Sequence, residues 1–251
     1  MRILVISLSK ISKAFLKIQQ SVQVDVYSPN STIEEFNCVN DFANLNGIYT
    51  HIFLGCKPQH IESVSQTLPL NLYNSQTVFI SVLAGIKSEK IKKLFKTEKI
   101  FRVMPSLAFA FGNSFLAYHT SGIDNEEARN IKNLFGNNFL LECQNEQEID
   151  YFTGVYGSGI GFVFEIMNAF FAKSQELFPN EDSREIVLNL FQNACEYMEN
   201  NPDSSFSNAS QNVASKGGTT EAGLNFLRNQ NLLQSVISGA IDEAITKARK
   251  M

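Results

Sequence analysis

Short apolar runs alternate with polar stretches along the first 150 residues of the chain. Apolar runs of strand length occur at residues 3–6, 22–27, 52–54 and 78–82. Between them, residues 11–18 and 87–95 carry apolar side chains at the three- and four-residue spacing of a helix. Strands that alternate with helices are typical of a doubly wound α/β domain, in which helices cover both faces of a parallel sheet. We therefore predict such a domain for residues 1–150.

The pattern changes after residue 150, where apolar residues recur at helical spacing. We expect no strand there, and helices at residues 162–177, 182–198, 221–229 and 232–248. The first of these helices is apolar nearly all round, which favours an interface between two copies of the chain, with packing inside one chain as the alternative. Residues 199–218 are rich in Asn, Ser and Gly, so we expect a long connection there. Residues 151–251 are thus predicted to be an all-α domain.

Composition narrows the range of functions. Among 251 residues, 21 Lys and Arg stand against 25 Asp and Glu, so no excess of positive charge favours nucleic acid or an anionic membrane as partner. The four cysteines and three histidines are dispersed, which predicts a reducing compartment and no metal site. The opening apolar run is too short for an export signal, and Glu165 and Asn168 interrupt the apolar run 160–172, so we expect no membrane span. These features predict a cytoplasmic protein.

The strongest candidate for chemistry is the segment VASKGGTTEAGL at residues 213–224. Gly217 and Gly218 let the backbone approach a ligand closely, and Thr219 and Thr220 supply hydroxyls where a helix is predicted to begin. The first turn of a helix presents unpaired N–H groups and the positive end of the helix dipole, which together bind small anions. The segment therefore predicts a carboxylate site, with an ordinary helix cap as the alternative.

The turn after the first predicted strand is a second candidate. Dinucleotide-binding turns have the pattern G-x-G-x-x-G, in which missing side chains let a pyrophosphate touch the backbone. Here Ser7, Ser9 and Ser12 occupy all three glycine positions. The turn either still holds a phosphate at the helix N-terminus near Lys10 or binds no nucleotide. Lys57 follows the strand 52–54 and lies at the edge of the sheet where such folds bind ligands.

Five segments, in the same order, are similar to those of the pyrroline-5-carboxylate reductases, which catalyse the last step of proline biosynthesis. The most specific is 213–224, in which Lys216 stands where the family usually has proline. The others are FLGCKPQ at 53–59, ISVLAG at 80–85, RVMPS at 102–106 and GSG at 157–159. The resemblance implies an N-terminal Rossmann domain and a C-terminal helical domain whose helices interleave in a homodimer, sometimes assembled into larger rings.

The resemblance also implies hydride transfer from NADPH or NADH to the C=N carbon of 1-pyrroline-5-carboxylate, which gives L-proline. Thr220 would be the catalytic residue, hydrogen-bonded to the ring nitrogen. The substrate carboxylate would be bound by Ser215, Gly217, Gly218 and Thr219. The cofactor would be bound by Ser7, Leu8, Ser9, Lys10, Ile11, Ser28, Gly55, Cys56, Lys57, Pro58, Val82, Leu83 and Ala84. NADPH is favoured over NADH, because no acidic residue follows the second strand at the ribose position and Ser28, Asn30 and Ser31 offer hydrogen bonds to a phosphate.

Two alternatives are compatible with the sequence. The serines at positions 7, 9 and 12 fit a dimeric family member that has lost tight nucleotide binding and has weak or no catalytic activity. In the second alternative, the substrate is a related cyclic imine or another small carboxylate, because the sequence does not define the size of the pocket.

Overall fold

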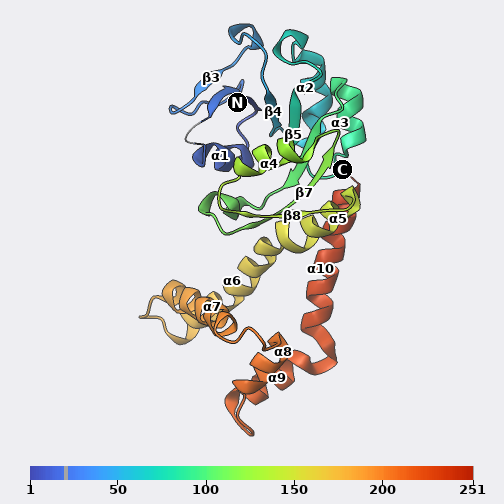
Figure 1. The fold of residues 1–251 in the computed structure, drawn as a ribbon. Coiled ribbons are helices and arrows are strands. Elements are labelled where there is room, and N and C mark those ends of the chain that lie inside the picture. Colours follow the sequence, from blue (N-terminus) through green and yellow to red (C-terminus); the bar gives the residue numbers. More distant parts are fainter. Residues whose placement is uncertain (20–21, 251) are drawn as a thin grey trace. The chain divides into compact units, whose positions relative to one another are not determined.

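In a computed structural model, which describes residues 1–19 and 22–250, eight strands form one sheet (Figure 1). The strands are β1 (Arg2–Ile6), β2 (Gln23–Tyr27), β3 (Asn37–Val39), β4 (His51–Leu54), β5 (Val78–Ser81), β6 (Ile100–Met104), β7 (Phe115–Ser121) and β8 (Phe139–Glu142). Their order across the sheet is β3-β2-β1-β4-β5-β6-β7-β8. Successive strands extend the sheet to one side of β1 and then to the other, which is the arrangement of a doubly wound fold.

The sheet is parallel from β3 to β6, whereas β7 runs antiparallel to β6 and β8 runs parallel to β7. The change of direction follows from chain length. Only residues 105–114 connect β6 to β7, which is too short for the helical crossover that a parallel neighbour requires. The parallel sheet predicted from the sequence thus has one antiparallel pair, at this edge, and the doubly wound α/β fold class is confirmed.

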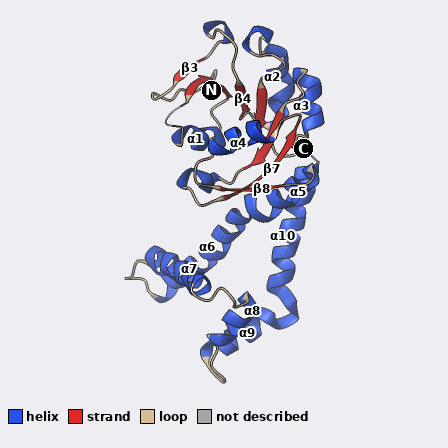
Figure 2. Cartoon of the chain, viewed as in Figure 1, coloured by secondary structure: helices blue, strands red, loops and turns tan. Residues whose placement is uncertain are grey.

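Both faces of the sheet are covered by helices, as Figure 2 shows. The helices of this region are α1 (Lys10–Lys17), α2 (Ile61–Thr67), α3 (Ser88–Phe95), α4 (Asn125–Asn133) and α5 (Glu146–Phe152). Ile3 and Val5 belong to one core cluster with residues of α1 and α4. The alternating residues Leu4 and Ile6 belong to another, with residues of α2 and α3. The nearly continuous apolar sequence of β1 is thus explained by burial on both faces.

Arg102 of β6 ties the sheet to α5. Its side chain is 1% exposed and forms ion pairs with Glu146 at 3.1 Å and Asp150 at 3.3 Å. Glu146 also accepts a hydrogen bond from the Ser88 backbone N–H at 2.7 Å. Burial raises the pKa of Glu146, but these partners outweigh it and hold the pKa below its usual value. The arginine of the RVMPS segment is therefore part of the scaffold.

The second half of the chain is helical, and the structure describes no strand in residues 151–250. Its helices are α6 (Gly159–Leu177), α7 (Ser183–Glu199), α8 (Phe206–Asn212), α9 (Thr219–Arg228) and α10 (Leu232–Arg249). Two compact units are distinguished, one comprising Met1–Ser158 with the segment that starts at Glu243, the other Gly159–Asp242. The sequence places the boundary at residue 150, inside α5.

The segment 199–218 is not the continuous loop expected from its composition, because α8 lies within it. Ser205 caps this helix by accepting a hydrogen bond from the Asn208 N–H at 3.1 Å, so the abundance of serine reflects helix capping as well as connection. The glycines around residue 157 are likewise helical. A π-helical turn at Thr153–Gly157 joins α5 to α6 in one helical run, Glu146–Leu177.

The helical unit has almost no core of its own. Within its described part, only Ser174, Ser183 and Val187 are buried. Large apolar side chains are exposed on every helix of the unit, including Phe164 at 60%, Phe206 at 81% and Phe226 at 77%. Because exposed apolar area of this extent is unfavourable in water, these helices need a covering surface.

Candidate functional site

The cofactor-binding residues predicted from the sequence lie together at one edge of the sheet. Ser7 follows β1, Ser28 follows β2, Gly55–Pro58 follow β4 and Val82–Ala84 follow β5. Strands β1 and β4 are neighbours in the sheet. The strands that follow β1 in the chain lie on one side of this pair, and those that follow β4 lie on the other. Ligands of doubly wound sheets bind beyond the carboxyl ends of the strands at such a switch point.

The turn between β1 and α1 keeps the backbone shape that glycine normally provides. Ser7 has a φ of 75°, which is in the left-handed region. Its N–H donates to the Tyr27 carbonyl at 2.8 Å, which fixes the turn against β2. A residue with a Cβ is strained by about 1–2 kcal/mol in this conformation. The first glycine of the dinucleotide pattern has thus been replaced while its backbone conformation has been retained.

The other two serines of the turn are accommodated without strain of this kind. Ser9 is the N-cap of α1, where its hydroxyl accepts from the Ser12 N–H at 3.1 Å and lies 2.9 Å from the Ser12 hydroxyl. Ser12 is fully buried and lies against Gly55, where a Cβ would overlap the Ser12 oxygen. Gly55 therefore provides the space that the missing third glycine would have provided. The exposed Lys10 lies in the first turn of α1, beside Leu8 and Ile11, which are both half-buried.

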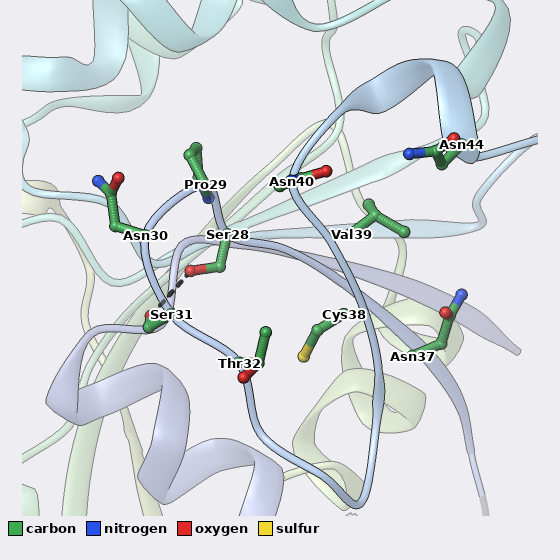
Figure 3. A pocket seen from close by; sticks show the side chains of 10 residues that line it. All are labelled: Ser28, Pro29, Asn30, Ser31, Thr32, Asn37, Cys38, Val39, Asn40 and Asn44. Atoms are coloured by element: carbon green, nitrogen blue, oxygen red, sulfur yellow. Dashed lines mark hydrogen bonds between the residues drawn. The ribbon is translucent and has the colours of Figure 1, made fainter.

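A pocket of about 580 Å³ opens at the carboxyl ends of β2 and β3 (Figure 3). Ser28, predicted from the sequence, lines it, and its hydroxyl lies 2.9 Å from that of Ser31. The lining is otherwise neutral and mostly polar: Pro29, Asn30, Thr32, Asn37, Cys38, Val39, Asn40 and Asn44. Such a lining offers hydrogen bonds to a ribose or a phosphate and no carboxylate that repels a phosphate.

Asn40 and Asn44 are candidate ligand-binding residues that the sequence analysis missed. They follow β3, whose three residues are too few to show a strand pattern. The available signal was the recurrence of asparagine at positions 37, 40 and 44, after the polar segment 28–32.

The residues after β4 and β5 have distinct environments. Cys56 is buried, and burial raises the pKa of its thiol to about 11, so the thiol is neutral at pH 7. Cys56 therefore contributes packing and not a nucleophile. Lys57 is exposed and Pro58 half-buried, while Leu83 is buried between the half-buried Val82 and Ala84. Among the described residues, no cluster of His, Cys, Asp and Glu could hold a metal ion.

The predicted carboxylate site lies at the start of α9, in the helical unit. Gly218 is the N-cap, and no side chain of the described residues caps the helix. Gly217 has a φ of 73°, which its lack of a side chain permits. Ser215, Thr219 and Thr220 are exposed, so their hydroxyls are accessible. The first turn of α9 is thus an open N-terminus with two threonines.

The two glycine amides are already engaged within the loop. The Gly217 N–H donates to the Glu221 carboxylate at 2.8 Å, and the Gly218 N–H donates to the Ser215 carbonyl at 2.9 Å. The glycines therefore shape the turn, and the amides at the start of α9 are left to face a ligand. Glu221 was not recognised from the sequence, although a Glu three residues after an N-cap is the spacing of a capping box.

Comparisons with known proteins agree with this architecture. Residues 146–251 match the model of the pyrroline-5-carboxylate reductase dimerisation domain. The pyrroline-5-carboxylate reductase of Staphylococcus haemolyticus is 27% identical, and the similarity covers 95% of this chain and 92% of that protein. That of Aquifex aeolicus is 28% identical, covering 80% of this chain and 74% of that protein.

Solved structures share the fold over the whole chain. A Plasmodium falciparum pyrroline carboxylate reductase with NADP bound has a TM-score of 0.88 at 19% identity, covering 100% of this chain and 97% of that one. A 1-pyrroline-5-carboxylate reductase from Streptococcus pyogenes has a TM-score of 0.81 at 22% identity, covering 100% and 99%. The fold and site define a Rossmann-type protein with an all-helical C-terminal region. The chain is similar to pyrroline-5-carboxylate reductases over nearly its whole length, and its C-terminal part matches their dimerisation domain.

The helical run Glu146–Leu177 is long and apolar enough, by length and composition, to cross a membrane. Glu165 and Asn168 lie within this run, so they do not by themselves argue against a membrane span. The run lies within the segment that matches a dimerisation domain, and helices that pack against a second chain show the same composition.

Proposed function

We propose that this protein is a pyrroline-5-carboxylate reductase, which reduces the C=N bond of 1-pyrroline-5-carboxylate to give L-proline. The observation that supports this most directly is the open N-terminus of α9, which carries the Thr219–Thr220 pair and the family's loop sequence. An uncapped helix N-terminus binds a small carboxylate without a full positive charge. The adjacent threonine hydroxyls can hydrogen-bond the ring nitrogen and so orient the ring.

The cofactor of this proposal is NADPH. The residues present fit it: the left-handed turn at Ser7 precedes the N-terminus of α1, and the polar pocket beside Ser28 follows β2, where doubly wound folds bind an adenosine ribose. The Ser28 and Ser31 hydroxyls and the nearby asparagines can donate to a 2′-phosphate. The same donors can bind an unphosphorylated ribose, so NADH is the second cofactor to test. The alternative of a family member without nucleotide binding is not favoured, because Gly55 makes room for Ser12 and Ser9 caps α1.

When bound, the dihydronicotinamide supplies the hydride, which goes to the imine carbon, while a proton completes the amine. The protein holds the planar substrate ring against the nicotinamide and excludes water. In this proposal the backbone N–H and the hydroxyl of Thr219 and the hydroxyl of Ser215 bind the substrate carboxylate. Gly217 and Gly218 keep the loop in shape. The Thr220 hydroxyl hydrogen-bonds the ring nitrogen, which orients the C=N bond.

The active form of this proposal is a homodimer in the cytoplasm. The helical unit exposes apolar residues on each of its helices, and the matching family model is a dimerisation domain. A second copy is the simplest cover, because it presents the same apolar helices. Rings of several dimers are compatible with this reading. The proposal includes no nucleic acid and no membrane among the partners.

The test is a spectrophotometric assay of the purified protein, in which NADPH or NADH oxidation is followed with 1-pyrroline-5-carboxylate. We expect turnover with both substrates present and none with either omitted. Calorimetric titration with each cofactor provides a second measurement. No oxidation and no binding heat at millimolar NADPH and NADH would refute the proposal.

A further inference from the structure

Four aromatic rings form a continuous row on the sheet-containing unit, at its β8 edge. The row, which we call the aromatic row, consists of Phe115 of β7, Phe139 of β8, Phe152 of α5 and Tyr156 of the π-helical turn. Phe115 stacks on Phe139 with ring centres 5.1 Å apart, and Phe152 stacks on Tyr156 at the same distance. An edge-to-face contact at 6.0 Å between Phe115 and Tyr156 joins the two pairs.

The row is held in place by hydrogen bonds as well as by stacking. The Tyr156 hydroxyl accepts from the Phe115 N–H at 3.1 Å and lies 3.3 Å from the Ser114 hydroxyl. The rings are therefore fixed in one arrangement and offer a preformed surface. Binding to such a surface loses little side-chain entropy.

The surface is apolar and open. Phe115 is 47% exposed, Phe139 54% and the neighbouring Leu141 52%. In β8, Leu140 packs against the core on the other face of the sheet. The strand is thus apolar on both faces, which is typical of strands that are covered on both sides. Helix α5 contributes Ile149 and Phe152 to a small cluster on β6 and β7, but Phe139 and Leu141 do not belong to it.

We propose that the aromatic row and Leu141 form part of the interface with a second copy of this chain. Two of its four rings, Phe152 and Tyr156, lie inside the segment 146–251 that matches the family's dimerisation domain. The other two come from β7 and β8, outside that segment. The inference rests on the proposed homodimer and extends its interface from the helical unit onto the sheet-containing unit.

Two substitutions on the full-length protein test this: Phe139→Ser and Leu141→Ser. The matched control is Phe111→Ser, at a side chain that is 87% exposed and outside the row. Sedimentation equilibrium measures the dimer dissociation constant of each protein, and circular dichroism checks that each is folded. We expect Phe139→Ser to raise the dissociation constant at least tenfold and Leu141→Ser to raise it to a smaller extent. Phe111→Ser should leave it unchanged.

The outcomes separate this inference from the proposed dimer. A wild-type protein that is monomeric at every concentration would refute the homodimer and the interface together. A wild-type dimer whose dissociation constant is unchanged in both row variants would refute the interface alone. A lower melting temperature of the row variants without weaker dimerisation would show that the chain's own helices cover the row, and would also overturn the inference.

Discussion

Ser12 and Gly55 share one small space beneath the turn between β1 and α1. A Cβ on residue 55 would overlap the Ser12 hydroxyl, which is held 2.9 Å from the Ser9 hydroxyl. The Gly55 N–H in turn donates to the Ile6 carbonyl at 3.1 Å, so the backbone of residue 55 cannot easily move away. The absence of a side chain at position 55 thus compensates for the presence of one at position 12.

Gly55→Ala should therefore destabilise the protein by about 1–3 kcal/mol, the usual cost of overpacking a rigid site. In the double variant Gly55→Ala with Ser12→Gly, most of this loss should be recovered, because the overlapping oxygen is gone. Urea denaturation of the four proteins in the cycle measures both effects. Losses that simply add would contradict the shared space.

Ser7→Gly should raise the free energy of unfolding by about 0.5–1 kcal/mol, because relief of strain at φ 75° exceeds the added entropy of the unfolded chain. It should also tighten NADPH binding, since a Cβ is removed from the turn. Lys96→Gly is the control, because Lys96 has a φ of 51° after α3, away from the proposed site. It should stabilise the protein similarly and leave the NADPH dissociation constant unchanged. Equal affinity of wild type and Ser7→Gly would argue against the turn as cofactor site.

Thr220→Ala should lower kcat/KM for 1-pyrroline-5-carboxylate at least about tenfold, because a hydrogen bond to the oriented ring is lost. Thr220→Ser keeps a hydroxyl and should retain most of the activity. Steady-state kinetics with the imine varied at saturating NADPH distinguishes the two. Full activity of the alanine variant would exclude Thr220 from the reaction.

Glu221 places a negative charge beside the proposed carboxylate site while its oxygen accepts from the Gly217 N–H. Glu221→Gln keeps an acceptor and removes the charge, so KM for the anionic substrate should fall about fivefold, corresponding to roughly 1 kcal/mol at a partly solvated site. The kcat value should change little. The difference from wild type should shrink as salt is raised from 20 to about 500 mM, since exposed charges are screened. An unchanged KM at low salt would place the substrate carboxylate elsewhere.

His51, at the start of β4, makes stability depend on pH. Burial, with a smaller effect of the N-terminal amino group, lowers the pKa of His51 to about 4. The unfolded chain, with a pKa near 6.5, binds the proton more readily, so stability is full above pH 6.5 and falls between about pH 6.5 and 4. The loss should be at most about 3 kcal/mol. Denaturation midpoints across this range should show a slope that His51→Gln reduces; an equal slope in both proteins would contradict the assignment.

The sequence alone determined the features that depend on local pattern. Strands β1, β2, β4 and β5 and helices α1, α3, α6, α7, α9 and α10 follow from apolar periodicity, because burial on one face imposes a period of two or 3.6 residues. Helices α2, α4, α5 and α8 were not predicted. The loop 213–224 and the turn 7–12 were recognisable because their chemistry is contiguous in the chain. Strands β3, β6, β7 and β8 were not predicted, and the three residues of β3 are too few to show a period.

Only the tertiary structure decided the features that depend on residues distant in sequence. The reversal of β7, the pairing of Ser12 with Gly55 and the pocket shared by Ser28 and Asn40 each join segments that the pattern treats separately. The hydrogen bond from the Gly217 N–H to the Glu221 carboxylate joins residues close in sequence, yet it depends on the folded shape of the loop. The periodicity of a sequence indicates which residues are buried. Packing in three dimensions decides which residues they contact, and the chemistry of a site depends on those contacts.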